Sequence, residues 1–228
     1  MNKSLILLPG AIIIAGLILA ISIYLVRTNG IEAPQIGDVN AIRPVTPDDR
    51  LVGNPEAPVV VVTYTNTDCV YCKQFQRTMA QIMTEYGTAG EVAWVYRHFP
   101  LVAMFPNSGT HAEATECAAG VGGADAFWQF IDALHVAAPA SLEFDPKDYG
   151  TLLPRLGLNQ EEFEKCLNEG RYVGKVESDL TNGLDIGVTE TPYSVILIEG
   201  AEPITISGAL SYLEMGSVLD AAIKEVVR

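Results

Sequence analysis

The chain is short of positive charge, with 14 Lys and Arg residues against 28 Asp and Glu residues in a length of 228, for a net charge of −14. Proteins that bind nucleic acid need basic patches to neutralise phosphates, so the sequence excludes that function class. The same deficit argues against attraction to anionic lipid headgroups. An acidic surface instead favours solubility and weakly repels acidic partners.

Histidine and cysteine are also scarce, with three and four residues respectively. His98, His111 and His135 are not closely paired, so they do not supply the second pair of ligands that a zinc site needs beside a CxxC motif. The phosphate-binding patterns GxGxxG and P-loop are absent, as are internal repeats and low-complexity tracts. We therefore expect no metal, nucleotide or flavin cofactor.

One long apolar run lies at the N-terminus. Residues 5–26 are interrupted only by two glycines, a proline and a serine, and a helix of this length spans roughly 30 Å, the thickness of a bilayer's hydrocarbon core. We predict an uncleaved transmembrane anchor over residues 1–26. Because Lys3 precedes the run and acidic residues follow it, the domain is expected on the extracytoplasmic side. The alternative is a signal peptide cleaved near residues 20–22.

The next segment has no periodic apolar pattern. Residues 27–50 contain three prolines, two glycines and the cluster Asp48-Asp49-Arg50, a composition typical of a solvated linker. We predict a flexible tether over this range. The folded domain is then expected over residues 51–228.

The domain alternates between strand and helix patterns. β-Branched and alternating runs predict strands at residues 59–64, 91–99, 193–198 and 203–206. Apolar positions at helical spacing predict helices at 75–86, 108–119, 127–134, from 146, 159–170, 173–184 and 212–227. This order describes an α/β layer fold with a four-helix insertion over about residues 106–170.

The motif Cys69-Val70-Tyr71-Cys72 falls between the first of these strands and its helix. Unpaired N–H groups and the positive end of the helix dipole favour a thiolate on Cys69. Cys72, one turn deeper, can resolve a mixed disulfide formed at Cys69. We predict redox chemistry with Cys69 and Cys72 as the catalytic pair. A structural disulfide and half of a zinc site are the alternatives.

Spacing makes Cys69 and Cys72 one pair, which leaves Cys117 to pair with Cys166. Both of the latter lie on apolar helix faces, which favours a structural disulfide. The alternatives are a second redox pair that relays electrons from the first, and two free buried thiols. Disulfides persist outside the cytoplasm, in agreement with the expected location.

With these elements in order, residues 51–228 resemble the DsbA-type branch of the thioredoxin-like family. The matching segments are Cys69–Phe75, Tyr96–Leu101, the Ala-rich His111–Ala119, Lys165–Gly170 and Gly187–Pro192. The resemblance implies a membrane-attached or exported thiol:disulfide oxidoreductase that donates disulfides to unfolded or reduced exported polypeptides. It also implies a quinone-linked membrane partner that re-oxidises the pair.

The resemblance further implies a cis bond between Thr191 and Pro192 beside the dithiol. Such a turn would offer the backbone of Thr191 to an extended substrate as one strand of a short ladder. Tyr71, a spacer at the start of the helix, is expected to form part of the same surface. The predicted substrate-binding residues are therefore Tyr71, Thr191 and Pro192.

The chain departs from the family pattern between the cysteines. Many oxidising members carry Pro-His there, whereas this chain has Val70-Tyr71, and Asp68 is expected to oppose a thiolate on Cys69 by like-charge repulsion. We expect the pKa of Cys69 in the upper half of the range of roughly 3.5–7.5 seen for such motifs. A disulfide reductase or isomerase, and a dithiol that carries Cu(I), therefore stay open as alternative functions.

The three histidines receive structural interpretations. His98 ends a predicted strand, and we expect neighbouring backbone groups to satisfy it, with tuning of the dithiol as the alternative. His111 and His135 are expected at helix surfaces or helix ends.

Overall fold

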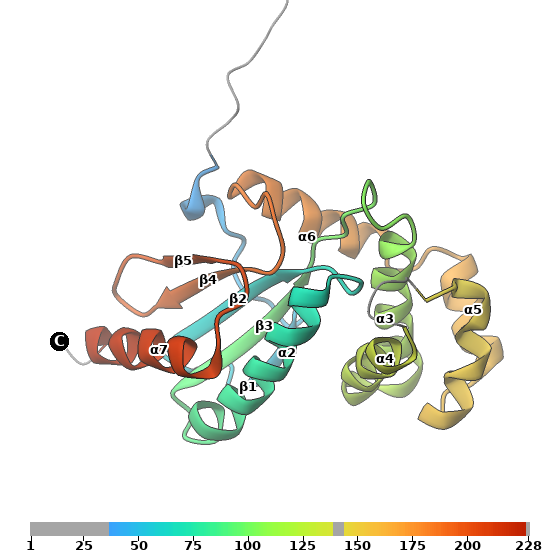
Figure 1. The fold of residues 1–228 in the computed structure, drawn as a ribbon, viewed down its shortest axis with the longest axis horizontal. Helices are drawn as coiled ribbons and strands as arrows, with labels where there is room; N and C mark the ends of the chain where they lie inside the picture. Colours follow the sequence, from blue (N-terminus) through green and yellow to red (C-terminus); the bar gives the residue numbers. More distant parts are fainter. Residues whose placement is uncertain (1–36, 139–143, 227–228) are drawn as a thin grey trace, which may run out of the picture. The chain divides into compact units, whose positions relative to one another are not determined.

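The computed structural model describes residues 37–138 and 144–226. Its centre is a five-stranded sheet in the order β1-β3-β2-β4-β5 (Figure 1). The strands are β1 (Arg50–Gly53), β2 (Val59–Thr65), β3 (Val92–His98), β4 (Tyr193–Ile198) and β5 (Ile204–Ser207). β2 and β3 are parallel, and the other neighbours are antiparallel. A parallel pair needs a crossover connection, and here the helix that follows the CxxC motif supplies it.

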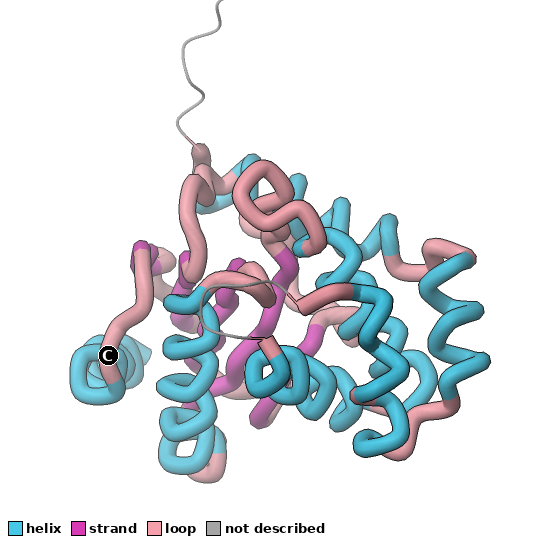
Figure 2. Tube along the Cα trace, turned by 45° about the vertical axis from the view of Figure 1, so that its right-hand side comes forward, coloured by secondary structure: helices cyan, strands magenta, loops and turns pink. Residues whose placement is uncertain are grey.

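Helices cover both faces of the sheet. The elements outside the insertion are η1 (Val39–Ala41), α2 (Val70–Ile82), η2 (Met83–Gly87), α6 (Val173–Asp185) and α7 (Tyr212–Val226). The insertion contains α3 (Ser108–Gly122), α4 (Ala124–Ala137), η3 (Pro146–Thr151), η4 (Leu153–Leu156) and α5 (Gln160–Asn168). Figure 2 shows the strands enclosed by helices. The helix expected from residue 146 is two short 3₁₀ turns, η3 and η4.

Alternation along β2 divides the core into two layers. Val59 and Val61 pack with α2 and α7 on one face, in a cluster that includes Phe75 and Leu219. Val62 and Tyr64 point the other way, into the cluster under α6 and η1. Since successive strand residues face opposite sides of a sheet, this apolar strand is buried on both faces, as the unbroken β-branched run suggested.

The approach of α6 to the sheet depends on a glycine. A Cβ at Gly183 would lie 2.6 Å from the ring of Phe99 and 3.0 Å from the ring of Tyr64. A side chain at this position would force the helix away from the sheet. The position matters for the site because Leu180 and Leu184 of the same helix line the groove described below.

The helical insertion has a core of its own. Phe130, Phe163 and Leu153 are almost fully buried among its helices. Cys117 on α3 and Cys166 on α5 form a disulfide with an S–S distance of 2.07 Å. This is the disulfide pairing that the sequence predicted, and the bond links α3 to α5.

Part of the predicted tether belongs to the folded domain. Residues 37–50 pack against α6 and the sheet, with Asp49 buried and bonded to Arg97, and with Arg43 bonded to Asp179 at 2.7 Å. The prediction of a flexible tether over residues 27–50 is therefore wrong for residues 37–50. Ion pairs hold this segment against the domain. Charged residues give no periodic apolar pattern in a sequence, so the pattern alone indicated a tether.

The predicted anchor over residues 1–26 and the first part of the tether lie outside the described residues. Within residues 37–138 and 144–226, no helix combines the length and apolar character needed to cross a membrane.

Candidate active site

Cys69 lies at the N-cap of α2, just after the chain leaves β2. A short turn connects the two elements, closed by a hydrogen bond from the Cys69 N–H to the Asn66 carbonyl at 3.2 Å. The carbonyl of Cys69 accepts the first helical bond, from the N–H of Lys73 at 3.0 Å. The N–H groups of the first turn lack partners within the helix, and they stabilise negative charge on the sulfur.

Both thiols of the motif are free. Cys69 is 8% exposed and lines a groove, whereas Cys72 is 4% exposed and shares the buried side of α2 with Phe75 and Met79. A substrate in the groove therefore meets Cys69 first. The roles of attacking cysteine for Cys69 and resolving cysteine for Cys72 stay predictions.

The two thiols differ in acidity. The pKa of Cys69 is lowered to about 6, and the largest cause is a hydrogen bond from the Cys72 thiol. Burial opposes this effect. The N–H groups of Cys72 and Tyr71 and a contact with Thr191 add to the lowering. Burial, together with the neighbouring Cys69, raises the pKa of Cys72 well above its usual value. At neutral pH the accessible sulfur is a thiolate and the buried one is a thiol.

The peptide bond between Thr191 and Pro192 is cis. In its thiol form, Cys69 donates from Sγ–H to the Thr191 carbonyl at 3.5 Å. Two segments that are 122 residues apart in sequence therefore meet at the dithiol. The strand β4 follows immediately after Pro192, so the sheet fixes this turn in place.

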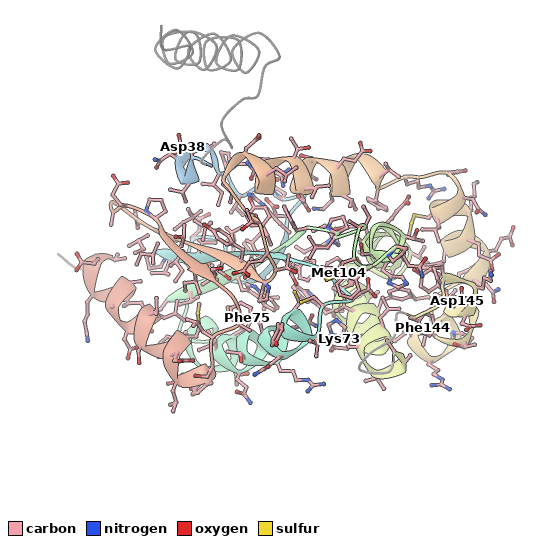
Figure 3. All side chains as sticks on the ribbon, turned by 45° about the horizontal axis from the view of Figure 1, so that its top comes forward. Asp38, Lys73, Phe75, Met104, Phe144 and Asp145 are labelled. Carbon is pink, nitrogen blue, oxygen red and sulfur yellow. A yellow bond between two sulfur atoms is a disulfide. The ribbon has the colours of Figure 1, made fainter. Side chains whose placement is uncertain are left out.

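An apolar groove of about 620 Å³ opens beside Cys69. Its rim carries exposed apolar side chains, including Tyr71 at 63% and Met104 at 70% exposure (Met104 is labelled in Figure 3). The groove is lined by Cys69, Val70, Tyr71, Phe99, Pro100, Leu101, Val102, Ala103, Met104, Phe105, Leu180, Leu184, Thr189, Glu190 and Thr191. Exposed apolar side chains gathered at one place mark a contact surface.

Two histidines of the insertion hold the turn that precedes Cys69. His111 Nδ1 lies 2.8 Å from Asp68 Oδ1, and His135 Nε2 donates to the Thr67 carbonyl at 3.1 Å. We expected His111 and His135 at helix surfaces or helix ends: His111 is in the first turn of α3 and His135 in the last turn of α4, but the side chain of His111 is fully buried and does not face solvent. Burial and the nearby Lys73 lower the pKa of His135 to about 4, so its ring is neutral at physiological pH.

His98 contacts a buried carboxylate. Its Nε2 lies 3.1 Å from Glu116 Oε1, and Arg50 donates to the other oxygen of the same carboxylate through its Nε at 2.8 Å. Despite the burial of Glu116, the bond from His98 and the bond from Arg50 lower the pKa of Glu116 to about 2. A side chain, and not the backbone as we expected, therefore satisfies the ring of His98.

The structure thus brings Cys69, Cys72, Tyr71 and Thr191 together, with Pro192 next to them. The disulfide cysteines lie apart, in the insertion. In the described part of the chain, no group of three or more His, Cys, Asp or Glu side chains is arranged to hold a metal ion.

Sequence reasoning missed the pairing of His111 with Asp68 and the contribution of residues 99–105 to the groove. The burial of His111, on which its pairing with Asp68 depends, could have been predicted from the sequence. His111 stands three residues before Ala114 and seven before Ala118 on α3, which is the spacing of a buried helix face.

A family model described as thioredoxin matches residues 45–221. Among curated relatives, the Na(+)/H(+) antiporter NhaA 3 of Salinispora tropica is 32% identical over 167 residues, which cover 73% of this chain and 24% of the antiporter. The Na(+)/H(+) antiporter NhaA 1 of Mycobacterium sp. strain KMS is 34% identical over 187 residues, covering 80% of this chain and 29% of that protein. The chain spans about a quarter of the length of the curated relatives that it matches.

Solved structures give the same fold. Wolbachia pipientis alpha-DsbA1 matches with a TM-score of 0.68 and 20% identity, over 80% of this chain and 94% of that one. BdbD from Bacillus subtilis, in its oxidised form, matches with a TM-score of 0.67 and 21% identity, over 82% of this chain and 100% of that one. Pseudomonas aeruginosa DsbA2 matches with a TM-score of 0.65 and 23% identity, over 81% and 100%. The chain therefore belongs to the thioredoxin family and has the same fold as these DsbA-type structures.

Proposed function

We propose that the Cys69–Cys72 disulfide is donated to reduced, unfolded polypeptides outside the cytoplasm. One observation carries the proposal: Cys69, with a pKa lowered to about 6, lines an apolar groove beside the cis Thr191–Pro192 turn. An ionised, reachable sulfur next to a surface for extended chains suits exchange with unfolded protein.

The reaction has two exchange steps. A substrate thiolate attacks the Cys69 sulfur of the oxidised pair, the Cys69–Cys72 bond breaks, and Cys72 leaves with the electron pair and takes up a proton. A second substrate thiolate then attacks the substrate sulfur of the mixed disulfide and expels Cys69 as a thiolate. Two electrons pass from the substrate to the enzyme, and the substrate leaves with a disulfide.

The acidity of Cys69 favours this direction. A thiol of low pKa is a good leaving group in the second step, and stabilisation of its thiolate favours the reduced enzyme over the oxidised one. Cys72, whose pKa is raised well above its usual value, takes up a proton when it leaves in the first step and is a thiol once reduction is complete.

Substrate contacts follow from the lining of the groove. The backbone of Thr191 can pair with an extended segment, while Tyr71 and Met104 present apolar surface to its side chains. Glu190 is the charged residue of the lining, so we expect recognition of apolar, unfolded segments with little dependence on their charge.

We further propose that the protein acts on the outer side of the membrane, held there by residues 1–26 and re-oxidised by a membrane redox partner. The Cys117–Cys166 disulfide supports an oxidising location. Retention of the full chain in the membrane fraction after alkaline extraction is the expected result. Release into the soluble fraction would contradict the anchor.

A trapping experiment tests the assigned roles. The reduced full-length C72S variant, mixed with an unfolded protein that carries a disulfide, should accumulate a disulfide-linked adduct at Cys69, because the Cys69 thiolate attacks that disulfide, one substrate sulfur leaves as a thiolate, and the resolving thiol is missing. The matched C69S variant should form none. Equal adducts from both variants, or none from C72S, would contradict the roles given to the two cysteines.

A redox titration of the full chain tests the direction. A potential of about −120 to −180 mV supports disulfide donation, whereas one near about −270 mV would identify a reductase. Stoichiometric copper that is lost in C69S, without activity on reduced unfolded protein, would instead identify a copper-carrying dithiol.

A further inference from the structure

The residue directly before Cys69 is a carboxylate that is withdrawn from solvent. Asp68 has a side chain that is 6% exposed, and its Oδ1 lies 2.8 Å from Nδ1 of His111, whose side chain is 1% exposed. The second carboxylate oxygen accepts from the Thr67 hydroxyl at 3.4 Å. A buried carboxylate without a counter-charge is costly, so the histidine has an electrostatic role here.

Hydrogen bonding determines the charge of this histidine. Nδ1 faces the Asp68 carboxylate, and Nε2 lies 2.9 Å from the carbonyl oxygen of Phe144. Both neighbours are acceptors. Neutral imidazole has one N–H, so it would leave one lone pair pointing at an acceptor, whereas the imidazolium donates to both. The two acceptors therefore favour the imidazolium form, in which the Asp68–His111 pair has no net charge.

We propose that His111 is a positioning residue for the exchange reaction, which neutralises and orients Asp68 so that this carboxylate does not oppose a thiolate on Cys69. The inference rests on the proposed role of Cys69 as the attacking sulfur. It replaces our expectation that Asp68 weakens the acidity of Cys69. The insertion thereby contributes directly to the dithiol, through α3.

Other charged and titratable groups surround the pair. Lys73 on α2 interacts electrostatically with both Asp68 and Cys69. His135 on α4 also interacts electrostatically with Asp68. On the far side, Tyr149 packs edge-on to the His111 ring with centroids 5.9 Å apart. Asp145 and Glu113 are charged neighbours of Tyr149. Phe144 and Asp145, which are labelled in Figure 3, belong to the insertion and directly precede η3. Among these groups, His111 is the one in hydrogen-bond contact with Asp68.

Thiolate absorbance of the reduced full chain, followed against pH, tests the proposal. H111Q should move the Cys69 midpoint upward by about one pH unit, which is a tenfold fall in the acid dissociation constant of this thiol and, at a pH above both midpoints, about 30 mV in potential. Adding D68N to H111Q removes the uncompensated charge, so the double variant should return towards wild type. An unchanged midpoint in H111Q, or no rescue in the double variant, would overturn the proposal.

H135Q is the matched control. His135 holds the same turn through the Thr67 carbonyl, but it is neutral at physiological pH. Its substitution loosens the turn without exposing a charge, so the midpoint should stay near that of wild type. A shift as large as that of H111Q would mean that anchoring of the turn, and not charge, is responsible.

A measurement on wild type avoids any effect of the substitutions on folding. With ¹⁵N-labelled histidine, the His111 ring should show two protonated nitrogens at pH 7. An unprotonated Nδ1 at pH 7 would overturn the proposal. If Cys69 is not the attacking sulfur, the C72S trap fails while the histidine signals keep their expected values, so the two failures are distinguishable.

Discussion

At the scale of single residues, the sulfur at the N-cap of α2 is stabilised as a thiolate by the second thiol of the motif and by backbone N–H groups. Backbone N–H groups of Tyr71 and Cys72 and the thiol of Cys72 favour the Cys69 thiolate. This chain therefore reaches a pKa of about 6 without a histidine between the cysteines. The value lies in the upper half of the range that the sequence suggested.

The acidity of Cys69 predicts its labelling. In the reduced protein, alkylation of Cys69 should rise with pH around a midpoint of about 6 and level off above it, because the thiolate is the reactive form. Cys72 should stay unlabelled at pH 7. Iodoacetamide labelling followed by peptide mass mapping measures both sites.

A C72A variant provides a control for the source of this effect. Removing the largest lowering contribution should raise the midpoint of Cys69. Equal labelling of both cysteines at pH 7 in wild type would show that the two thiols do not differ as described.

At the scale of elements, segments with strong periodicity were predicted well. The strand expected at residues 193–198 is β4, and the helix expected at 212–227 is α7, which ends at Val226. β1 was missed, since Arg50–Gly53 follows an acidic, proline-containing stretch and is too short to show alternation. Its pairing with β3 is a tertiary contact, which local sequence does not encode.

The packing of α6 predicts a strong effect of one methyl group. G183A should lower the free energy of unfolding by about 1–3 kcal/mol, because the added Cβ would lie 2.6 Å from Phe99. G174A in the same helix is the matched control. In the described part of the chain, no atom beyond its chain neighbours and the backbone of the same helix lies within 4 Å of its added Cβ, so it should stabilise the protein by up to about 1 kcal/mol through helix propensity. Urea unfolding at pH 7 measures both, and equal effects would contradict this account of the packing.

The disulfide of the insertion predicts a second stability change. It closes a loop with a sequence separation of 49, so C117A/C166A should lose about 4 kcal/mol of unfolding free energy in the chain-entropy model. Thermal unfolding of oxidised wild type and of the variant gives the difference. A change below about 1 kcal/mol would show that the bond does not brace the domain. Electron transfer from Cys69–Cys72 to this pair would indicate a relay instead.

At the scale of the whole molecule, buried charges link segments that are far apart in sequence. Arg97 on β3 binds Asp49 at 3.0 Å, Arg43 joins Asp49 to Asp179 on α6, and Lys175 lies 3.1 Å from Asp179. Lys175 also lies 3.6 Å from Glu116 on α3. These contacts connect the N-terminal segment, the sheet, α6 and the insertion, and removing one charge leaves its partner buried.

Acid should weaken the molecule in two stages. His135 has a folded-state pKa lowered to about 4, so its contribution is present above its ordinary pKa of about 6.5 and is lost as the pH falls towards 4. Glu116, with a pKa lowered to about 2, loses its contribution as the pH falls from about 4.5 towards 2. Each loss is on the order of 3 kcal/mol.

Chemical unfolding at a series of pH values measures these stages. H135Q should flatten the dependence between about pH 6.5 and 4, and E116Q should flatten it below about pH 4.5. Identical pH dependence in wild type and both variants would contradict the assigned groups.

The candidate site was partly predictable for a physical reason. Cys69 and Cys72 lie on one helix turn, and Thr191-Pro192 is a local motif, so sequence and family resemblance located them. The pairing of His111 with Asp68 and the groove wall at residues 99–105 depend on how the insertion docks on the sheet. Docking joins residues 43 positions apart, and a single sequence does not report such contacts.

The apolar lining of the groove has a consequence for turnover. In the function that we propose, the groove binds apolar side chains and unpaired backbone, which a polypeptide exposes only before it folds. A substrate that folds after it has received its disulfide buries its apolar side chains and pairs its backbone. Its affinity for the groove therefore falls once folding is complete. Completed products then leave without a dedicated ejection step, and incomplete ones return for another round.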